Sequence, residues 1–149
     1  MPFQGWRRRL MLALAVLVWA VPALADLPAT IKKIKPSIVA VGTYQPTRSP
    51  AFEFRGTGFV VGDGMMIATN AHVLPAVLDV DKRESLVVIR PGNERHSVLP
   101  VVRVANDPAH DVAVLRLKEG GPLPALPLED RNAEEGESVA FTGFPIGSA

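Results

Sequence analysis

The feature that most restricts the fold of this chain is a series of short apolar stretches, each five to ten residues long. They are rich in β-branched residues, which favour extended backbone. Turn-forming sequences such as Pro-Gly-Asn and Asn-Asp-Pro lie between them. The stretches span residues 37–44, 52–61, 65–69, 85–90, 97–105 and 112–117. Short strands at fairly regular spacing, with little helix between them, predict an all-β fold that is an antiparallel barrel or sandwich.

Glycines indicate where the predicted sheet turns or coils. The tight-turn sequence Gly-Asp-Gly at 62–64 predicts a hairpin between residues 52–61 and 65–69. Gly56 and Gly58 interrupt the first of these strands, and a glycine inside a strand usually marks a bulge or sharp coiling. These two glycines would let a barrel coil tightly.

Residues 1–25 have the pattern of a secretory signal peptide. Three arginines at 7–9 precede an apolar run of 12 residues, Leu10 to Val21, and Ala23-Leu24-Ala25 matches a cleavage site. A transmembrane helix needs about 20 apolar residues, so the run is short for a membrane span. An uncleaved anchor is the alternative, but the placement of the cleavage site favours removal after Ala25. We expect an exported protein, periplasmic or secreted, with no stable membrane anchor after cleavage.

Charge and cysteine content exclude several classes of function. The signal-like segment holds three of the 16 basic residues and none of the 15 acidic ones, which leaves 13 basic residues and a net charge of −2. No basic patch for nucleic acid remains in such a chain. The chain has no cysteine, which excludes thiol catalysis and cysteine-ligated zinc.

Two residues at strand ends could form a catalytic pair. His72 follows the strand 65–69, and Asp111 precedes the strand 112–117. In acyl transfer an imidazole takes a proton from a nucleophile, while a carboxylate fixes its tautomer and stabilises the imidazolium. The order His, Asp, Ser is one of the known chain orders for such a triad. The simpler interpretations are a loop histidine without a role and a turn aspartate that binds nearby amides.

The remaining histidines favour no metal site. His96 lies in a charged turn sequence and is interpreted as a surface residue. His110 and Asp111 are adjacent, so in a strand they would point to opposite faces and would not pair. No compact ligand spacing connects the three histidines, so we do not expect them to form a metal site.

The sequences around His72 and Asp111 resemble those of the bacterial trypsin-like serine proteases, the branch that includes the HtrA-like periplasmic proteases. In that family a Gly-Ser/Thr-Gly-Phe strand and a hairpin precede a Thr-Asn-x-His-Val segment with the catalytic histidine. An Asp-x-Ala-Val/Leu-Leu segment carries the aspartate. The matching residues are Gly56, Thr57, Gly58, Phe59, Thr69, Asn70, His72 and Val73, and then Asp111, Ala113, Val114 and Leu115.

Two further blocks extend the resemblance over nearly all of residues 31–147. Residues 36–44 look like the family's first core strand, and 136–147 look like the Gly-x-x-Val-x-x-x-Gly-x-Pro block at which the second barrel begins. Between them, the glycines and prolines of 118–135 indicate an extended linker. Each block is moderately specific, whereas four blocks in the family's order are strong support.

The resemblance implies an antiparallel Greek-key β-barrel, the first barrel of a trypsin-like double barrel, plus the first strand of an incomplete second barrel. The expected organisation is a signal peptide at 1–25, a first barrel at 26–117, a linker at 118–135 and the truncated start of a second barrel at 136–149. It also implies a serine endopeptidase that acts on polypeptide substrates without a cofactor. His72 would be its general base, and Asp111 would orient that base.

The family's nucleophile segment, Gly-Asn/Asp-Ser-Gly-Gly, does not occur in this sequence. None of the six serines, at 37, 49, 85, 97, 138 and 148, is followed by glycine, and we reject Ser148 because only Ala149 follows it. The sequence therefore leaves two hypotheses. One is a serine protease represented by its amino-terminal part, with the nucleophilic serine beyond residue 149. The other is an inactive binding or scaffold module, or a decayed protease.

Overall fold

The computed structural model describes residues 27–90 and 97–144, so the signal-like segment, His96 and Ser148 lie outside the described residues. The chain forms two compact units, residues 1–30 and 31–149, and only residues 27–30 of the first are described. Helix α2 spans Leu27–Ile34, and a 3-10 turn, η1, at Lys35–Ser37 contains Pro36, which cannot continue the helix. Within the described residues no helix has the length and apolar character needed to cross a membrane.

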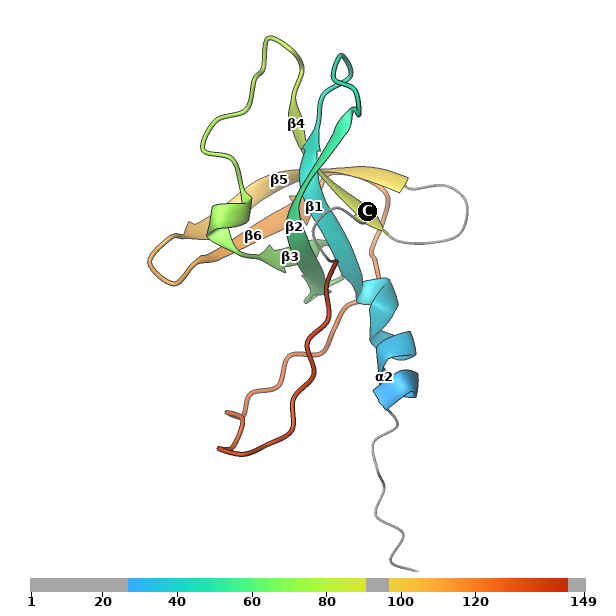
Figure 1. The fold of residues 1–149 in the computed structure, drawn as a ribbon, viewed down its shortest axis with the longest axis vertical. Coiled ribbons are helices and arrows are strands. Elements are labelled where there is room, and N and C mark those ends of the chain that lie inside the picture. The colour runs from blue at the N-terminus through green and yellow to red at the C-terminus, as the bar shows by residue number, and fades with distance from the viewer. Residues whose placement is uncertain (1–26, 91–96, 145–149) are drawn as a thin grey trace, which may run out of the picture. The chain divides into compact units, whose positions relative to one another are not determined.

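Six antiparallel strands close into a barrel in the order β1-β2-β3-β6-β5-β4 (Figure 1). Strand β4 lies beside β1, and β1, β2 and β3 follow one another across the sheet, which is the Greek-key arrangement. The strands are β1 Ile38–Tyr44, β2 Phe52–Val61, β3 Met66–Thr69, β4 Ser85–Arg90, β5 Ser97–Asp107 and β6 Val112–Leu117. The predicted all-β Greek-key barrel is confirmed.

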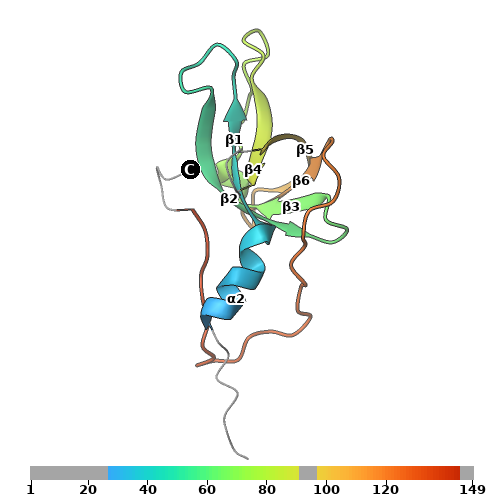
Figure 2. The same cartoon turned by 90° about the vertical axis from the view of Figure 1, so that its right-hand side faces the viewer.

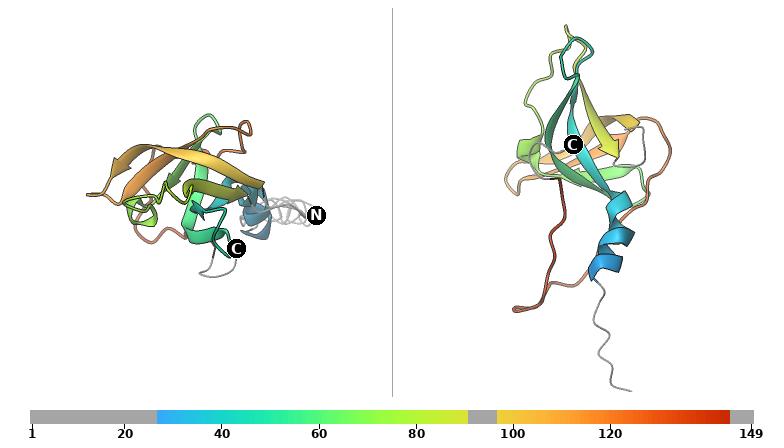
Figure 3. Two further views of the ribbon diagram at one scale, coloured as in Figure 1. Left: turned by 90° about the horizontal axis from the view of Figure 1, so that it is seen from above. Right: turned by 45° about the vertical axis from the view of Figure 1, so that its right-hand side comes forward.

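Two irregularities bend the sheet. The β1–β2 register shifts between Val41 and Gly42, so that Arg55 is an extra residue on β2 next to Gly56, as the glycine pattern predicted. A second shift makes Val104 an extra residue on β5, opposite β6. Bulges of this kind increase the local twist, and here they let a small sheet close on itself. The long strand β5 and its neighbour β6 lie side by side in the view from above (Figure 3, left).

The core fills the barrel with aliphatic side chains from all six strands. The largest fully buried apolar residues are Val39, Val41, Val60, Ile67, Val87, Val88 and Leu115. Burial of one such side chain contributes about 1.5–3 kcal/mol relative to its exposure. Because the chain has no disulfide, this packing carries the stability of the scaffold that presents the strand ends.

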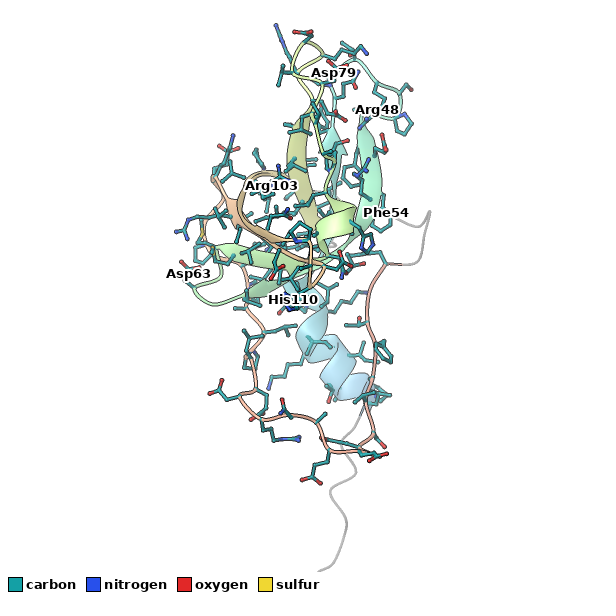
Figure 4. The ribbon with its side chains drawn as sticks, turned by 90° about the vertical axis from the view of Figure 1, so that its left-hand side faces the viewer. Arg48, Phe54, Asp63, Asp79, Arg103 and His110 are labelled. Atoms are coloured by element: carbon teal, nitrogen blue, oxygen red, sulfur yellow. The ribbon has the colours of Figure 1, made fainter. Side chains whose placement is uncertain are left out.

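Arg48 ties the loop after β1 to its surroundings (Figure 4). Its Nη1 atom lies 2.8 Å from Glu53 Oε2 and 3.1 Å from Glu84 Oε1. Its Nη2 atom donates to Thr43 O at 3.0 Å and to Ala51 O at 3.2 Å. One guanidinium thus joins β1, β2 and the loop that precedes β4.

After β6 the chain continues as coil, without a helix or strand in residues 118–144 (Figure 2). Leu123 is buried in the core cluster, its N–H donates to Gly64 O at 2.9 Å, and the Leu126 N–H donates to Val60 O at 2.8 Å. The predicted linker is therefore partly bound to the β2–β3 hairpin. The domain boundaries themselves stay predictions.

The strand expected over 136–147 is not formed in the described residues, which contain no strand after Leu117. A strand needs a neighbour to pair with, and none of the described segments supplies one here. The carboxyl-terminal end of this segment instead contacts β2. The Phe144 N–H donates to Thr57 Oγ1 at 2.9 Å, and the Phe144 ring meets the Phe54 ring edge-to-face at 6.4 Å. Val139 and Phe141 remain exposed, as an unpaired apolar segment leaves them.

Candidate active site

His72 lies on a single 3-10 turn, η2, at Ala71–Val73 directly after β3. The side chains of Val73 and Leu74 are buried and anchor this turn to the core. The His72 imidazole itself points outward, and 71% of the His72 side chain is exposed. The strand end therefore presents His72 on a rigid support, as the sequence indicated.

Asp111 lies at the end of the turn between β5 and β6. Its backbone has φ of +54°, the left-handed conformation that asparagine and aspartate tolerate better than most residues. Asp107 shapes the turn, since its Oδ1 accepts the N–H groups of Ala109 at 3.1 Å and His110 at 3.2 Å. The turn thus directs the Asp111 carboxylate back across β6 toward β3.

The sheet register brings the two predicted residues together. Thr69 of β3 pairs with Ala113 of β6, so the segments just beyond each residue emerge side by side. His72 Nδ1 lies 2.7 Å from Asp111 Oδ2, and the His72 backbone N–H donates to Asp111 Oδ1 at 3.0 Å. A carboxylate at Nδ1 favours the tautomer with its proton on that atom, which leaves Nε2 as the basic nitrogen. Among the described residues no group hydrogen-bonds Nε2.

Asn70 belongs to the same site, although the sequence alone did not mark it as a site residue. Its Nδ2 atom lies 3.1 Å from both the backbone oxygen and Oδ2 of Asp111. In the sequence Asn70 stood out only as part of a motif. The available signal was its position two residues before the candidate base, but no spacing rule connects such a residue to an aspartate 41 positions later.

The donors around Asp111 stabilise its charged form. The His72 backbone N–H, followed by the His72 ring and the Asn70 amide, holds the pKa of the Asp111 carboxyl below its ordinary value of 3.8. The side chain is 43% exposed, so solvent screens these interactions. The carboxylate is therefore ionised at neutral pH and accepts hydrogen bonds from the imidazole.

This pKa direction predicts a pH-dependent effect of Asp111→Asn. Because the folded-state pKa is lowered, the carboxylate stabilises the fold above 3.8, and this contribution is lost as the pH falls through the folded value. Asparagine tolerates the left-handed backbone, so the turn itself should persist. We expect the variant to unfold at lower urea concentration than wild type at about pH 6 and to match it at about pH 2. Asp130→Asn, at an exposed linker position, is the control. A difference of equal size at both pH values would contradict the expected linkage.

A second histidine–aspartate pair lies next to the first. His110 Nδ1 lies 2.7 Å from Asp107 Oδ2, within one turn of chain (Figure 4). His110 and Asp111 lie in this turn and not in a strand, so the alternation of a strand does not apply to them. Nowhere in residues 27–90 and 97–144 do three metal-ligating side chains form a cluster. None of the serines in these ranges hydrogen-bonds His72.

Comparison with known proteins identifies the family. Residues 56–149 match the model of the trypsin-like peptidase domain. The mitochondrial serine protease HTRA2 of Bos taurus is 37% identical over 92 residues, which cover 61% of this chain and 18% of that protein. A probable periplasmic serine endoprotease, DegP-like, of Halomonas elongata is 34% identical over 62% of this chain and 18% of its own length. The uncharacterized protein y4bJ of Sinorhizobium fredii is 32% identical over 84% of this chain and 18% of its own length.

The chain spans between 18% and 24% of the length of the curated relatives that it matches. The matched region contains the second half of β2, all of β3, β4, β5 and β6, and both residues of the histidine–aspartate pair. On the family match and the closed Greek-key barrel together, this chain belongs to the trypsin-like peptidase family.

Proposed function

We propose that this chain supplies the base and the orienting carboxylate of a serine endopeptidase. His72 is the general base and then the general acid, and Asp111 fixes its tautomer and stabilises the imidazolium. The nucleophile is a serine encoded after residue 149. The observation that carries the proposal is the 2.7 Å contact between His72 Nδ1 and Asp111 Oδ2 on two strand ends of a trypsin-like barrel.

The geometry supports a defined sequence of proton transfers. Nε2 takes the hydroxyl proton of the serine as the serine oxygen attacks the scissile carbonyl. The imidazolium that forms is stabilised by the Asp111 carboxylate, which stays ionised because its pKa is lowered. Nε2 then gives the proton to the leaving amine, and a second round with water hydrolyses the acyl-enzyme. No step needs a metal or an organic cofactor.

The proposed substrates are polypeptides, and the proposed location is outside the cytoplasm. The HTRA2 and DegP-like relatives are named as serine proteases, and the DegP-like relative is named as a probable periplasmic protein. The signal-like pattern of residues 1–25 supports export independently.

A serine-directed fluorophosphonate probe tests the proposal. The 149-residue chain should stay unlabelled, because none of its serines lies in a nucleophile segment. A longer product of the same gene, if its frame continues into a Gly-x-Ser-Gly-Gly segment, should be labelled at that serine and should cleave an unfolded protein substrate. A stop codon directly after residue 149 together with a stable, soluble product would instead support the inactive binding or scaffold module. Labelling at Ser148 would overturn the assignment of the nucleophile.

A further inference from the structure

Asn70 occupies the N-cap position of η2, but its side chain does not cap that turn. It is the residue at the amino-terminal end of η2, where an asparagine side chain usually caps the first free N–H groups. Here the side chain makes no capping hydrogen bond. It reaches instead to Asp111, 41 residues later in the sequence. The side chain is therefore used between two strand ends and not within its own turn.

The amide binds Asp111 at two points. Its NH₂ group lies 3.1 Å from the backbone oxygen of Asp111 and 3.1 Å from Oδ2. Both partners are obligate acceptors, so only the NH₂ end of the amide can face them, and the orientation of the group is fixed by chemistry. Oδ2 is also the carboxylate oxygen that lies 2.7 Å from His72 Nδ1. One amide thus holds both the main chain of Asp111 and the oxygen that contacts the base.

Asp111 needs such support more than a residue in regular structure would. Its backbone is left-handed, and its side chain is 43% exposed and open to competing water. Without further contacts, rotation about the side-chain bonds could turn the carboxylate away from the imidazole. Hydrogen bonds to both carboxylate oxygens restrict this rotation. The His72 backbone N–H donates to Oδ1, and the Asn70 amide donates to Oδ2.

We propose that Asn70 is a positioning residue, which orients the Asp111 carboxylate toward His72 and does so through the two hydrogen bonds of its amide. This inference rests on the proposed protease function for its catalytic consequence, but its structural part is testable without activity. A merely structural tie between the two strand ends is less well supported, since the Thr69–Ala113 pairing of β3 with β6 already holds them together.

The test follows the Asp111 carboxyl carbon by NMR through a pH titration of the full chain. In Asn70→Ala the pKa of Asp111 should rise toward 3.8 but remain below it, because the stronger His72 contacts persist. In Asn70→Asp the shape is kept, but a donor becomes a second carboxylate, so the pKa should rise further than in the alanine variant. Asn132→Ala and Asn132→Asp, made in the exposed linker, are matched controls and should leave the titration unchanged.

The two variants separate positioning from simple support. If Asn70 only braced the fold, the isosteric Asn70→Asp would stay closer to wild type than Asn70→Ala. That order, or an Asp111 pKa unchanged in both folded variants, would overturn the inference. In a longer product that hydrolyses peptides, Asn70→Ala should lower kcat about tenfold to a hundredfold with little change in KM. If that wild-type product proved inactive, the proposed function would fail while the titration result stood by itself.

Discussion

Replacement of His72 by alanine should lower kcat by about 10⁴- to 10⁶-fold in a product that carries the serine. The variant loses Nε2, the nitrogen proposed to accept the nucleophile's proton, while the side chain is 71% exposed and contributes little to packing. The barrel should therefore remain folded, and substrate binding should change far less than turnover. Steady-state kinetics on a peptide substrate, together with circular dichroism, measures both quantities.

His110 provides a matched control for this experiment. Its Nδ1 atom also lies 2.7 Å from an aspartate oxygen, its side chain is similarly exposed, and it lies one residue before Asp111. His110→Ala should leave kcat within about twofold of wild type, because the exposed His110 ring contacts Asp107 and makes no hydrogen bond to His72 or Asp111. An equal loss of kcat in the two variants would show that His72 is wrongly assigned as the base. Full activity of His72→Ala would refute the proposed mechanism.

Replacement of Gly42 by alanine should destabilise the barrel by about 3 kcal/mol or more. A β-carbon at this position would collide with the backbone oxygen of Glu53 and would lie 2.7 Å from Cζ of the Phe52 ring. Both atoms belong to β2 at the β1–β2 bulge, so the neighbouring strand cannot withdraw without the loss of ladder hydrogen bonds. Urea denaturation followed by circular dichroism gives the change in free energy of unfolding.

Gly62→Ala separates this collision from the cost of glycine's special backbone. Gly62 has φ of +63°, but a β-carbon there would meet no atom within 4 Å. The substitution should therefore cost about 1 kcal/mol, from backbone strain alone. If Gly42→Ala were no more destabilising than Gly62→Ala, close approach at the bulge would not be the reason for glycine at position 42.

The strands were predictable from local sequence because each is short, β-branched and bounded by turn residues. Residues 52–61, 85–90 and 112–117 are strands over the predicted ranges, and β5 extends two residues beyond its prediction. The bulge beside Gly56 was also predictable, because a glycine inside a strand commonly marks an irregularity of the ladder. His72 and Asp111 were found through their sequence context, and the structure brings them within hydrogen-bond distance.

Further features depend on long-range pairing that no local pattern encodes. The double contact of Asn70 with Asp111 follows from the β3–β6 register. The segment 136–144 has the apolar alternation of a strand, but extended backbone becomes a strand only when a neighbour completes its hydrogen bonds. Local sequence therefore predicted the strand propensity of this segment, but not whether the segment pairs into a sheet.

The burial of Leu123 has a consequence for chain mechanics. The predicted linker begins at residue 118, but backbone hydrogen bonds at Leu123 and Leu126 attach its first half to the barrel. Only the linker residues after Leu126 are not attached to the barrel in this way, so the effective length of the linker is roughly half of that expected from the sequence. A shorter linker raises the effective concentration, at the barrel, of any segment that the linker joins to it. The β2–β3 hairpin would also bear the load first if the carboxyl-terminal side of the chain were pulled.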